Sequence, residues 1–307
     1  MRILHLIDWE FQMDDVIRIS MVGGLNNKLI RLENTVGFAV ENNLRIIEPK
    51  FGWYDTTEEE KFSNLFDLNF FNENIEDKYG VSDILIPRSE YLGNEEKYKI
   101  VKHIKCVAGG RPRADDPFWE SSTLELKTNV MGSLRPSSKI ENIIQKNSCD
   151  QLVAVQLRIE KDWKQWTRRN RRLVRDKNEH VLISQEEFIE MFKNSELFSE
   201  NIFFTTGVKQ TDIQEKFESF DIDSRFFYDD SLGFETNATI NFFLCIGAKN
   251  FIGMTRSTFS QNIFFCRYLN GDCNSYFYNY GNQLHKKDCN VHSLSFNDLQ
   301  AKRFLEK

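Results

Sequence analysis

An alternation of apolar runs with amphipathic segments constrains the fold of this chain more than any other feature of its sequence. In the second half, strand-like runs at residues 152–157, 202–206, 225–228 and 250–254 are separated by helix-like segments. Parallel strands need crossover connections, and a helix between successive strands is the usual one. This half is therefore expected to be a parallel, doubly wound α/β sheet covered by helices.

Polar residues that cap helices mark the points where those helices begin. Ser184 and Glu187 have the spacing of a capping box, and Thr211 and Gln214 repeat that spacing. The helices expected in this half of the chain are residues 185–193, a helix that starts at 211, residues 236–247 and residues 258–269.

The start of the chain contains one further unit of the same kind. A strand at 16–21, a turn with two glycines at 22–27, a helix at 28–41 and a strand at 44–47 form a βαβ unit. The glycine turn then lies at the carboxyl end of the first strand, which is where doubly wound sheets bind their ligands.

A division into two domains is expected near the middle of the chain. Residues 51–138 have weak periodicity, and the order of their elements is not predicted. Ser137 can cap a helix that runs to about Lys146. We expect an N-terminal domain at 1–145 and a C-terminal domain at 146–307, both α/β and facing each other across a cleft.

Composition sets the size and class of the protein. The chain has 307 residues, of which 40% are hydrophobic and 27 are Phe, enough for two domains with substantial cores. Its formal net charge of −6 argues against a general nucleic-acid binder.

No run of the sequence approaches the roughly 18 to 20 apolar residues that span a membrane. The first residues become acidic too early for a secretory leader, so we expect a cytoplasmic protein. The six cysteines include no Cys-x-x-Cys pair, so we expect reduced thiols.

Three loops are expected at the carboxyl ends of strands, within residues 23–27, 156–163 and 256–260. Open α/β sheets bind their ligands at that edge. Gly23 and Gly24 allow the backbone to approach a ligand, and the helix that follows them presents free amide groups and the positive end of its dipole. The arrangement fits an anionic ligand, although a purely structural turn is the alternative.

Arg158 is the most informative residue of these loops. An arginine at the end of a buried strand can grip a diphosphate through two parallel hydrogen bonds and offset the charge on a leaving nucleotide. The alternative is a salt bridge to Glu160 or Asp162. Ser257 and Thr258 offer hydroxyl groups and helix N-terminal amide groups to phosphate oxygens, or they serve as ordinary helix caps.

The three loops resemble motifs of the GT-B fucosyltransferases. Residues 156–163 are similar to the His-Leu-Arg-Ile-x-x-Asp-Trp segment of animal protein O-fucosyltransferase 1. Residues 23–27 resemble the Gly-x-x-x-Asn-Gln turn that these enzymes share with the bacterial α1,2- and α1,6-fucosyltransferases. Residues 238–264 resemble the family's helix, strand and Ser-Ser-Phe loop, and the three segments occur in the family's order.

The resemblance implies a GT-B fold with two Rossmann-like domains and an inverting, metal-independent glycosyltransferase. Such an enzyme moves fucose from GDP-fucose, its donor substrate, to a hydroxyl of a glycan or protein without a cofactor. Asn26 and Asn27 then correspond to the catalytic turn asparagine, and Arg158 to the catalytic arginine on the β-phosphate. The implied donor-binding residues are Gly23, Gly24, Gln156, Arg158, Asn241, Arg256, Ser257, Thr258 and Phe259.

The sequence departs from the family's pattern at three points. Gln156 stands in place of a His, Asn241 stands in place of an Asp, and Thr206-Gly207 lacks the acidic residue of a Thr-Asp pair. Another GDP-sugar as donor, or a non-catalytic module of the same fold that binds a nucleotide or glycan, is therefore the alternative. No carboxylate stands out as a catalytic base among the candidates Asp8, Asp14, Asp15, Glu33, Glu160 and Asp162.

Three other clusters have interpretations of their own. The five arginines between residues 168 and 175 form either a solvated helix face or a contact for an anionic acceptor or nucleic acid. The aromatic run 276–280 is expected in the core or in the wall of an acceptor groove. Four further residues have the types that bind zinc, but their spacing matches no familiar zinc motif; they are Cys273, His285, Cys289 and His292.

Overall fold

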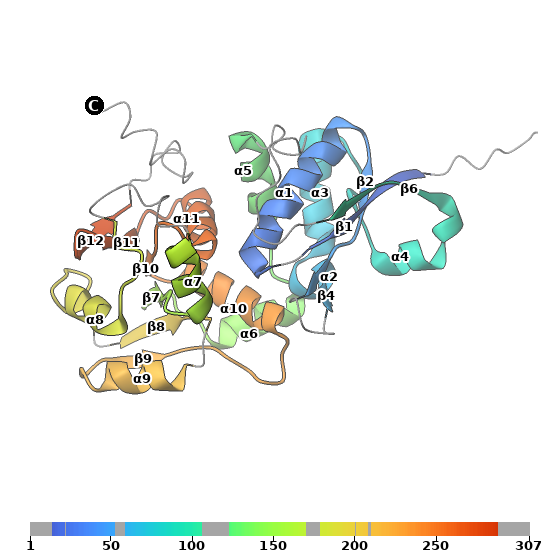
Figure 1. The fold of residues 1–307 in the computed structure, drawn as a ribbon. Helices are drawn as coiled ribbons and strands as arrows, with labels where there is room; N and C mark the ends of the chain where they lie inside the picture. The colour runs from blue at the N-terminus through green and yellow to red at the C-terminus, as the bar shows by residue number, and fades with distance from the viewer. Residues whose placement is uncertain are drawn as a thin grey trace, which may run out of the picture. The chain divides into compact units, whose positions relative to one another are not determined.

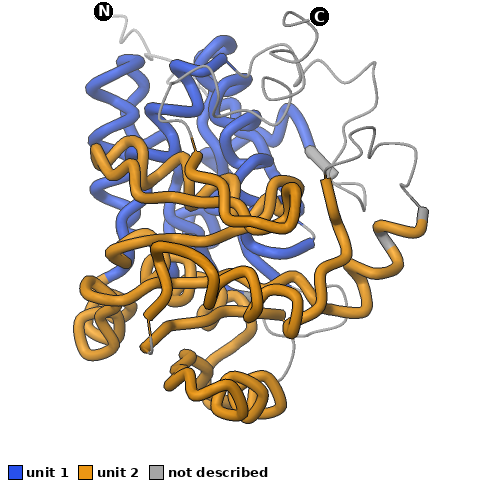
Figure 2. The backbone as a smooth tube through the Cα atoms, turned by 90° about the vertical axis from the view of Figure 1, so that its left-hand side faces the viewer, with its two compact units in different colours: residues 1–137 blue, residues 138–307 orange. Residues whose placement is uncertain are grey.

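The computed structural model describes residues 14–21, 23–52, 59–105, 123–169, 179–199, 201–207 and 210–287. The chain forms two compact units, residues 1–137 and 138–307, which Figure 2 draws in two colours. We expected the division after residue 145. Instead it comes before helix α6 (Ser138–Lys146), because this helix packs against α10 (Phe234–Gly247) of the second unit.

The first unit contains a parallel sheet with the strand order β5–β2–β1–β6, of which Figure 1 labels β2, β1 and β6. Strand β1 lies between β2 and β6, so that Val16 stands opposite both Arg45 and Ile100. The expected βαβ unit at the start of the chain is confirmed. Its elements and the strands beside it are β1 (Asp14–Ser20), α1 (Leu25–Glu41), β2 (Arg45–Ile47), β5 (Leu85–Ile86) and β6 (Tyr98–Lys105).

The region of weak sequence periodicity folds into short elements. Four buried phenylalanines, Phe51, Phe62, Phe66 and Phe71, pack there with ring centroids between 5.0 and 6.4 Å apart. No element of this region has more than three buried residues, and α4 and the 3₁₀ turn have none, which is too few to give a clear period. They are β3 (Lys50–Gly52), β4 (Glu59–Lys61), α2 (Phe62–Leu65), α3 (Leu68–Tyr79), α4 (Arg88–Gly93), a 3₁₀ turn (Glu95–Lys97) and α5 (Leu124–Gly132).

The second unit contains the doubly wound sheet that the alternation predicts. Its order is β12–β11–β10–β7–β8–β9, and every pairing is parallel except that of β11 with β12. Strand β7 is buried along its whole length, as is typical of a parallel strand covered on both faces. The strands are β7 (Val153–Gln156), β8 (Asn201–Thr205), β9 (Asp223–Arg225), β10 (Asn250–Gly253), β11 (Ser275–Tyr280) and β12 (Gln283–Lys286).

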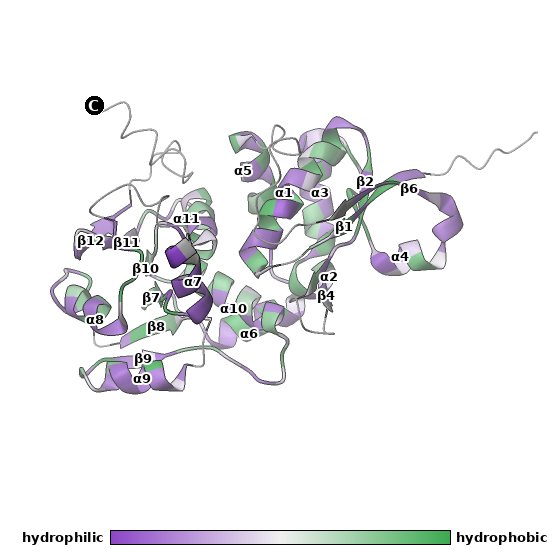
Figure 3. Ribbon diagram, in the orientation of Figure 1, coloured by the Kyte–Doolittle hydropathy of each residue, from purple (hydrophilic) through white to green (hydrophobic). Residues whose placement is uncertain are grey.

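One helix of the second unit, α8, begins at the capping box that the sequence predicts. The capping box at Ser184 is present: its hydroxyl accepts from the Glu187 amide at 3.2 Å, and the Glu187 carboxylate accepts from the Ser184 amide at 2.7 Å. Figure 3 shows that α7 is mostly hydrophilic while strands β7 and β8 are hydrophobic. The helices are α7 (Lys161–Arg169), α8 (Gln185–Lys193), α9 (Thr211–Glu218), α10 and α11 (Thr258–Leu269).

Two local expectations in this unit are wrong. The strand expected at 225–228 ends at Arg225, because the Phe227 carbonyl accepts from the Asn241 side chain, at 3.0 Å, and not from a neighbouring strand. The second capping box is absent. Gln214 instead donates to the Ser224 carbonyl at 3.0 Å, which ties α9 to the end of β9.

The cysteines are only partly as expected. Cys149, Cys245 and Cys266 are free and buried, and burial raises the pKa of Cys149 to about 11, so this thiol is neutral near pH 7. Cys273, however, is disulfide-bonded, which corrects the expectation of reduced thiols and removes Cys273 from the zinc set. Disulfides are typical of oxidising compartments, so Cys273 counts against the cytoplasmic location, which stays a prediction.

The aromatic run at 276–280 is the β11 strand, and Tyr276, Phe277 and Tyr278 are buried in the core as expected. Among the described residues, no helix is both long and apolar enough to cross a bilayer.

We expect Gly253→Ala to destabilise the protein by about 1–3 kcal/mol, as overpacking of a core does. A Cβ atom at this position would lie 2.5 Å from the Ser260 Oγ and 2.8 Å from the Ser260 Cβ, where α11 approaches β10. Urea unfolding followed by circular dichroism measures the effect. Gly247→Ala is the matched control, because a Cβ atom there meets no atom within 4 Å. Equal stabilities for the two variants would contradict the close approach.

Candidate functional site

The order in which the chain adds strands to the second sheet reverses between β7 and β10. From β7 the chain adds β8 and then β9 on one side, and it then crosses over to add β10 and β11 on the other. In sheets of this kind the ligand crevice lies at the carboxyl ends of the two strands where the order reverses. The loops after β7 and β10 contain two of the three expected motifs, so the topology brings both to this point.

The first sheet places the third motif in an equivalent position within its own unit. Strand β1 lies between β2 and β6, and Gly23 and Gly24 follow its carboxyl end. Gly23 has a φ of +97°, a conformation that favours glycine, and Gly24 is the N-cap residue of α1. Asn26 is buried in the first turn of α1, and the Asn27 amide donates to the Gly24 carbonyl at 3.0 Å. The predicted roles of these four residues stay predictions.

Two hydrogen bonds of the Ser260 hydroxyl, on α11, link the ends of the two central strands. The Ser260 hydroxyl donates to the Gln156 Oε1 at 2.5 Å and accepts from the Met254 amide at 3.0 Å. Gln156 ends β7, Met254 follows β10, and all three residues are buried. The Gln156 carbonyl oxygen is thus occupied by the protein, and any contact of Gln156 with a nucleotide stays a prediction.

The N-terminus of α11 lies at this edge of the sheet. Ser257 is the N-cap residue, and its hydroxyl accepts from the Ser260 amide, so the helix-cap interpretation of Ser257 is confirmed. Thr258 is exposed beside it, and the ring of Phe259 packs edge-on against Phe242 at 6.0 Å. The amide groups and dipole of this 12-residue helix favour an anion near Thr258.

Arg256 is held by a partner that the sequence did not indicate. Its guanidinium donates to both carboxylate oxygens of Glu179, at 2.8 and 2.6 Å, and the two side chains are only 4% and 6% exposed. The Thr255 hydroxyl donates to the same carboxylate at 2.6 Å. Glu179 precedes Arg256 by 77 positions, so no local pattern relates them. The pair fixes the loop after β10, and a ligand contact of Arg256 stays a prediction.

Arg158 lies between two carboxylates, as the salt-bridge interpretation predicts. Its terminal nitrogens are 3.6 Å from Glu160 Oε1 and 3.7 Å from Asp162 Oδ2. These distances exceed the roughly 2.7–2.9 Å of a charge-assisted hydrogen bond. The Arg158 Nε makes no hydrogen bond within the described chain. The guanidinium is therefore attracted to both carboxylates but keeps hydrogen-bonding capacity for a ligand.

Aromatic side chains fix the position of Arg158. Its guanidinium carbon lies 4.9 Å from the ring centre of Trp163, within the range of a cation–π interaction. The Trp163 indole donates to the Val181 carbonyl at 2.7 Å, which anchors the ring. The Arg158 amide donates to the hydroxyl of Tyr278 at 3.2 Å, and burial raises the pKa of that phenol, so it stays neutral. These contacts position the guanidinium at the end of β7.

Asn241 organises the loop after β9. Its amide group donates to the carbonyls of Phe227 and Asn237, at 3.0 and 2.8 Å. Asn237 in turn donates to the Asp229 carbonyl at 2.9 Å and accepts from the Asp229 amide at 2.9 Å. Both asparagines are buried. Sequence reasoning missed this structural role of Asn237, and the donor-binding role of Asn241 stays a prediction.

The other acidic candidates differ in their environments. Asp14 pairs with Arg45, Glu33 is buried in α1, and Asp162 is exposed. Asp8, like most of the arginine run and two members of the zinc set, lies outside the described residues. Within the described ranges, no group of three or more His, Cys, Asp or Glu side chains is arranged to hold a metal ion.

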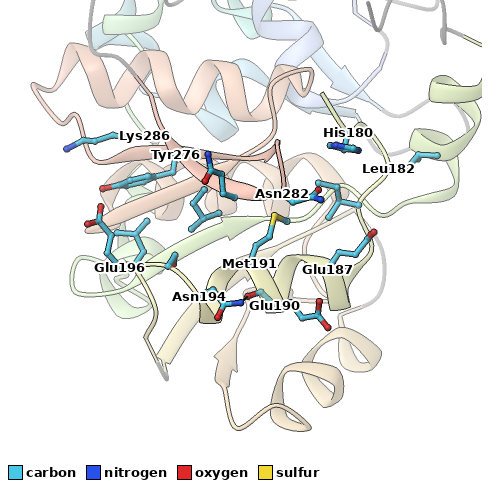
Figure 4. Close-up of a pocket in the computed structure, with 15 residues that line it drawn as sticks. His180, Leu182, Glu187, Glu190, Met191, Asn194, Glu196, Tyr276, Asn282 and Lys286 are labelled. Carbon is cyan, nitrogen blue, oxygen red and sulfur yellow. Dashed lines mark hydrogen bonds between the residues drawn. The ribbon is translucent and has the colours of Figure 1, made fainter. Parts of the chain in front are cut away.

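A cavity of about 610 Å³ lies elsewhere in the second unit, between α8 and the β11–β12 hairpin (Figure 4). Three carboxylates, those of Glu187, Glu190 and Glu196, line it together with Lys286. This excess of negative charge disfavours a diphosphate. The edge at β7 and β10, with Arg158 and the N-terminus of α11, suits an anionic ligand better.

No protein-family model and no curated protein sequence matches the chain. Solved structures, however, do match the fold of the chain. POFUT1 in complex with GDP-fucose superimposes with a TM-score of 0.59 at 14% identity, over 88% of this chain and 98% of POFUT1. The fucosyltransferase NodZ from Bradyrhizobium superimposes with a TM-score of 0.55 at 13% identity, over 90% of this chain and 99% of NodZ. The chain therefore has the fold of the GT-B fucosyltransferases, and the expected fold class is confirmed.

We expect Glu179→Ala to lower the free energy of unfolding by about 3–5 kcal/mol, because it leaves the buried Arg256 guanidinium without its counter-charge. Glu186→Ala is the control, since Glu186 pairs with Lys216 at 2.9 Å on the surface and its loss should cost less than about 1 kcal/mol. Urea denaturation measures both. Similar losses in the two variants would show that the buried pair contributes no more than a surface pair.

Proposed function

We propose that this chain, which has the GT-B fold, is a glycosyltransferase that moves fucose from GDP-fucose to a hydroxyl of a glycan or protein. The observation that carries the proposal is the position of Arg158. It follows the central strand β7 where the strand order of the sheet reverses, at the same edge of the sheet as the N-terminus of α11, and its Nε has no hydrogen-bond partner among the described residues. The structural neighbours, which include POFUT1 in complex with GDP-fucose, support GDP-fucose as the donor.

In the proposed reaction the acceptor hydroxyl attacks the anomeric carbon as the bond to the diphosphate breaks. Attack from the side opposite the diphosphate inverts the configuration of that carbon. Negative charge develops on the departing diphosphate, and Arg158 together with the amide groups of α11 stabilises it. Arg158 and the positive end of the α11 dipole thus stabilise the leaving diphosphate, as a metal ion does in other transferases. The proton of the acceptor hydroxyl passes to the departing diphosphate or to a base that is not assigned.

The remaining residues have supporting roles in the proposal. Ser257 and Thr258 present the amide groups of α11 to the diphosphate, while Gln156 and Glu179 hold the loops that carry these groups. Gly23, Gly24, Asn26 and Asn27 are proposed to contact the sugar and the acceptor. Asn241, Arg256 and Phe259 are proposed to border the nucleotide.

We expect Arg158→Ala to reduce turnover by roughly 10²–10³-fold, because it removes one preorganised donor to the leaving group. GDP release from GDP-fucose in the presence of a glycan library measures turnover. Arg225→Ala is the control: Arg225 is an exposed arginine of the same unit that donates to the Ser148 carbonyl. Near-native turnover in Arg158→Ala would refute the proposed mechanism, provided that both variants melt near the wild-type temperature.

We expect GDP and GDP-fucose to raise the melting temperature, whereas UDP- and dTDP-sugars leave it unchanged. A ligand at 100 times its Kd stabilises the folded state by about 2.7 kcal/mol. A thermal-shift screen over these nucleotide sugars measures the effect. Stabilisation by GDP-mannose with no effect of GDP-fucose would reassign the sugar. Stabilisation by GDP-fucose without GDP release to any acceptor would identify a non-catalytic binding module instead.

A further inference from the structure

Glu160 is a buried carboxylate beside the arginine that the proposed function depends on. Its side chain is 7% exposed, and its Oε1 lies 3.6 Å from the Arg158 guanidinium. Asp162 lies at a similar distance, 3.7 Å, but is 69% exposed. Water screens the charge of Asp162 far more than that of Glu160. Glu160 is therefore the acidic neighbour that has the larger effect on the electrostatic potential at Arg158.

The backbone, and not Arg158, holds Glu160 in place. The Gly207 amide donates to Glu160 Oε1 at 2.7 Å, and the Thr206 hydroxyl approaches the same oxygen at 3.5 Å. A Cβ atom at Gly207 would lie 2.9 Å from this oxygen, so glycine allows the close approach. Glu160 follows β7 and Gly207 follows β8, and the carboxylate thus links the loops after two adjacent strands.

Arg158 and Glu160 attract each other without a direct hydrogen bond, whereas a second arginine–glutamate pair of the same unit is hydrogen-bonded. Arg256 and Glu179 form two short hydrogen bonds, from the Nε and one terminal nitrogen of the guanidinium to the two carboxylate oxygens. In the Arg158 pair, neither the Nε of the arginine nor the Oε2 of Glu160 has a hydrogen-bond partner among the described residues. Glu160 attracts Arg158 without consuming its donors, so the guanidinium is oriented and remains available.

A negative charge at this place also weakens the binding of an anion to Arg158. A diphosphate that Arg158 holds carries charge of the same sign as Glu160 and would lie near it. Repulsion at that distance in a partly buried site is strong. Glu160 would therefore lower the affinity for the product GDP as well as fix the direction of the guanidinium.

We infer that Glu160 is a positioning residue that orients Arg158 and weakens its hold on the departing nucleotide, so that GDP is released after transfer. The inference rests on the proposed function, because it assigns Arg158 to the diphosphate. A merely structural carboxylate at this position would stabilise the loops after β7 and β8 and leave the affinity for GDP unaffected, or raise it by ordering the site.

Glu160→Gln tests the inference, because glutamine keeps the shape and removes the charge. We expect GDP to bind about tenfold more tightly, by isothermal titration calorimetry, since repulsion between the carboxylate and the diphosphate is lost. We expect kcat to fall, because Arg158 loses its orientation and GDP leaves more slowly. Unchanged or weaker GDP binding would overturn the inference.

A double-mutant cycle shows whether Glu160 acts through Arg158. In the background of Arg158→Ala, Glu160→Gln should change GDP affinity by less than a third of its effect in the wild type, because contacting residues are coupled. An equal effect in both backgrounds would overturn the inference. If the wild type binds no GDP, the proposed function fails and the inference fails with it. If it binds GDP and only the expected gain is missing, the inference alone fails.

Two further variants complete the test. Gly207→Ala moves the carboxylate without removing its charge, because the new Cβ displaces Glu160 Oε1, and it should lower kcat. Glu186→Gln makes the same chemical change in an exposed ion pair with Lys216 and should leave GDP affinity and kcat unchanged. Melting temperatures near that of the wild type keep these comparisons valid. A Gly207→Ala enzyme with wild-type kcat would contradict the positioning role.

Discussion

The candidate site depends on two hydrogen bonds of the Ser260 hydroxyl, at the point where the strand order of the second sheet reverses. The Ser260 hydroxyl joins Gln156 at the end of β7 to the Met254 amide after β10. Because all three groups are buried, losing this contact would leave unsatisfied polar atoms in the core. The absence of a side chain at Gly253 lets α11 approach closely enough to form it. The N-terminus of α11 and the loop with Arg158 are thereby fixed at the same edge.

Two arginines at this edge have the same chemistry but different environments. Arg256 is closed off by Glu179 in a buried pair with two short hydrogen bonds, which gives a rigid loop. Arg158 lies on the ring of Trp163 with carboxylates just beyond hydrogen-bonding distance. The first arrangement uses the guanidinium for structure, and the second keeps it for a ligand. This difference in geometry, and not the residue type, is why the proposed function assigns the diphosphate to Arg158.

Sequence patterns predicted local structure well wherever one signal dominated. The capping box at Ser184 and the buried strand β7 are confirmed because each depends on neighbours a few residues away. Prediction failed where a distant side chain decided the outcome. Strand β9 ends early because Asn241 binds the backbone after it, and Gln214 leaves its expected cap to bond Ser224. The phenylalanine cluster of the first unit joins residues of β3, α2 and α3 with one that follows α2, and no pattern within one element predicts it.

By itself, the sequence determined the fold class, the βαβ unit at the start of the chain, and the choice of Arg158 and Ser257 as residues suited to an anion. These depend on periodicity, capping and residue chemistry, which are local. Only the tertiary structure decided that the loops after β7 and β10 lie together, that Glu179 binds Arg256, and that the Gly207 amide holds Glu160 in place. Strand order and burial join residues that are far apart in the chain, and no pattern confined to neighbouring residues contains that information.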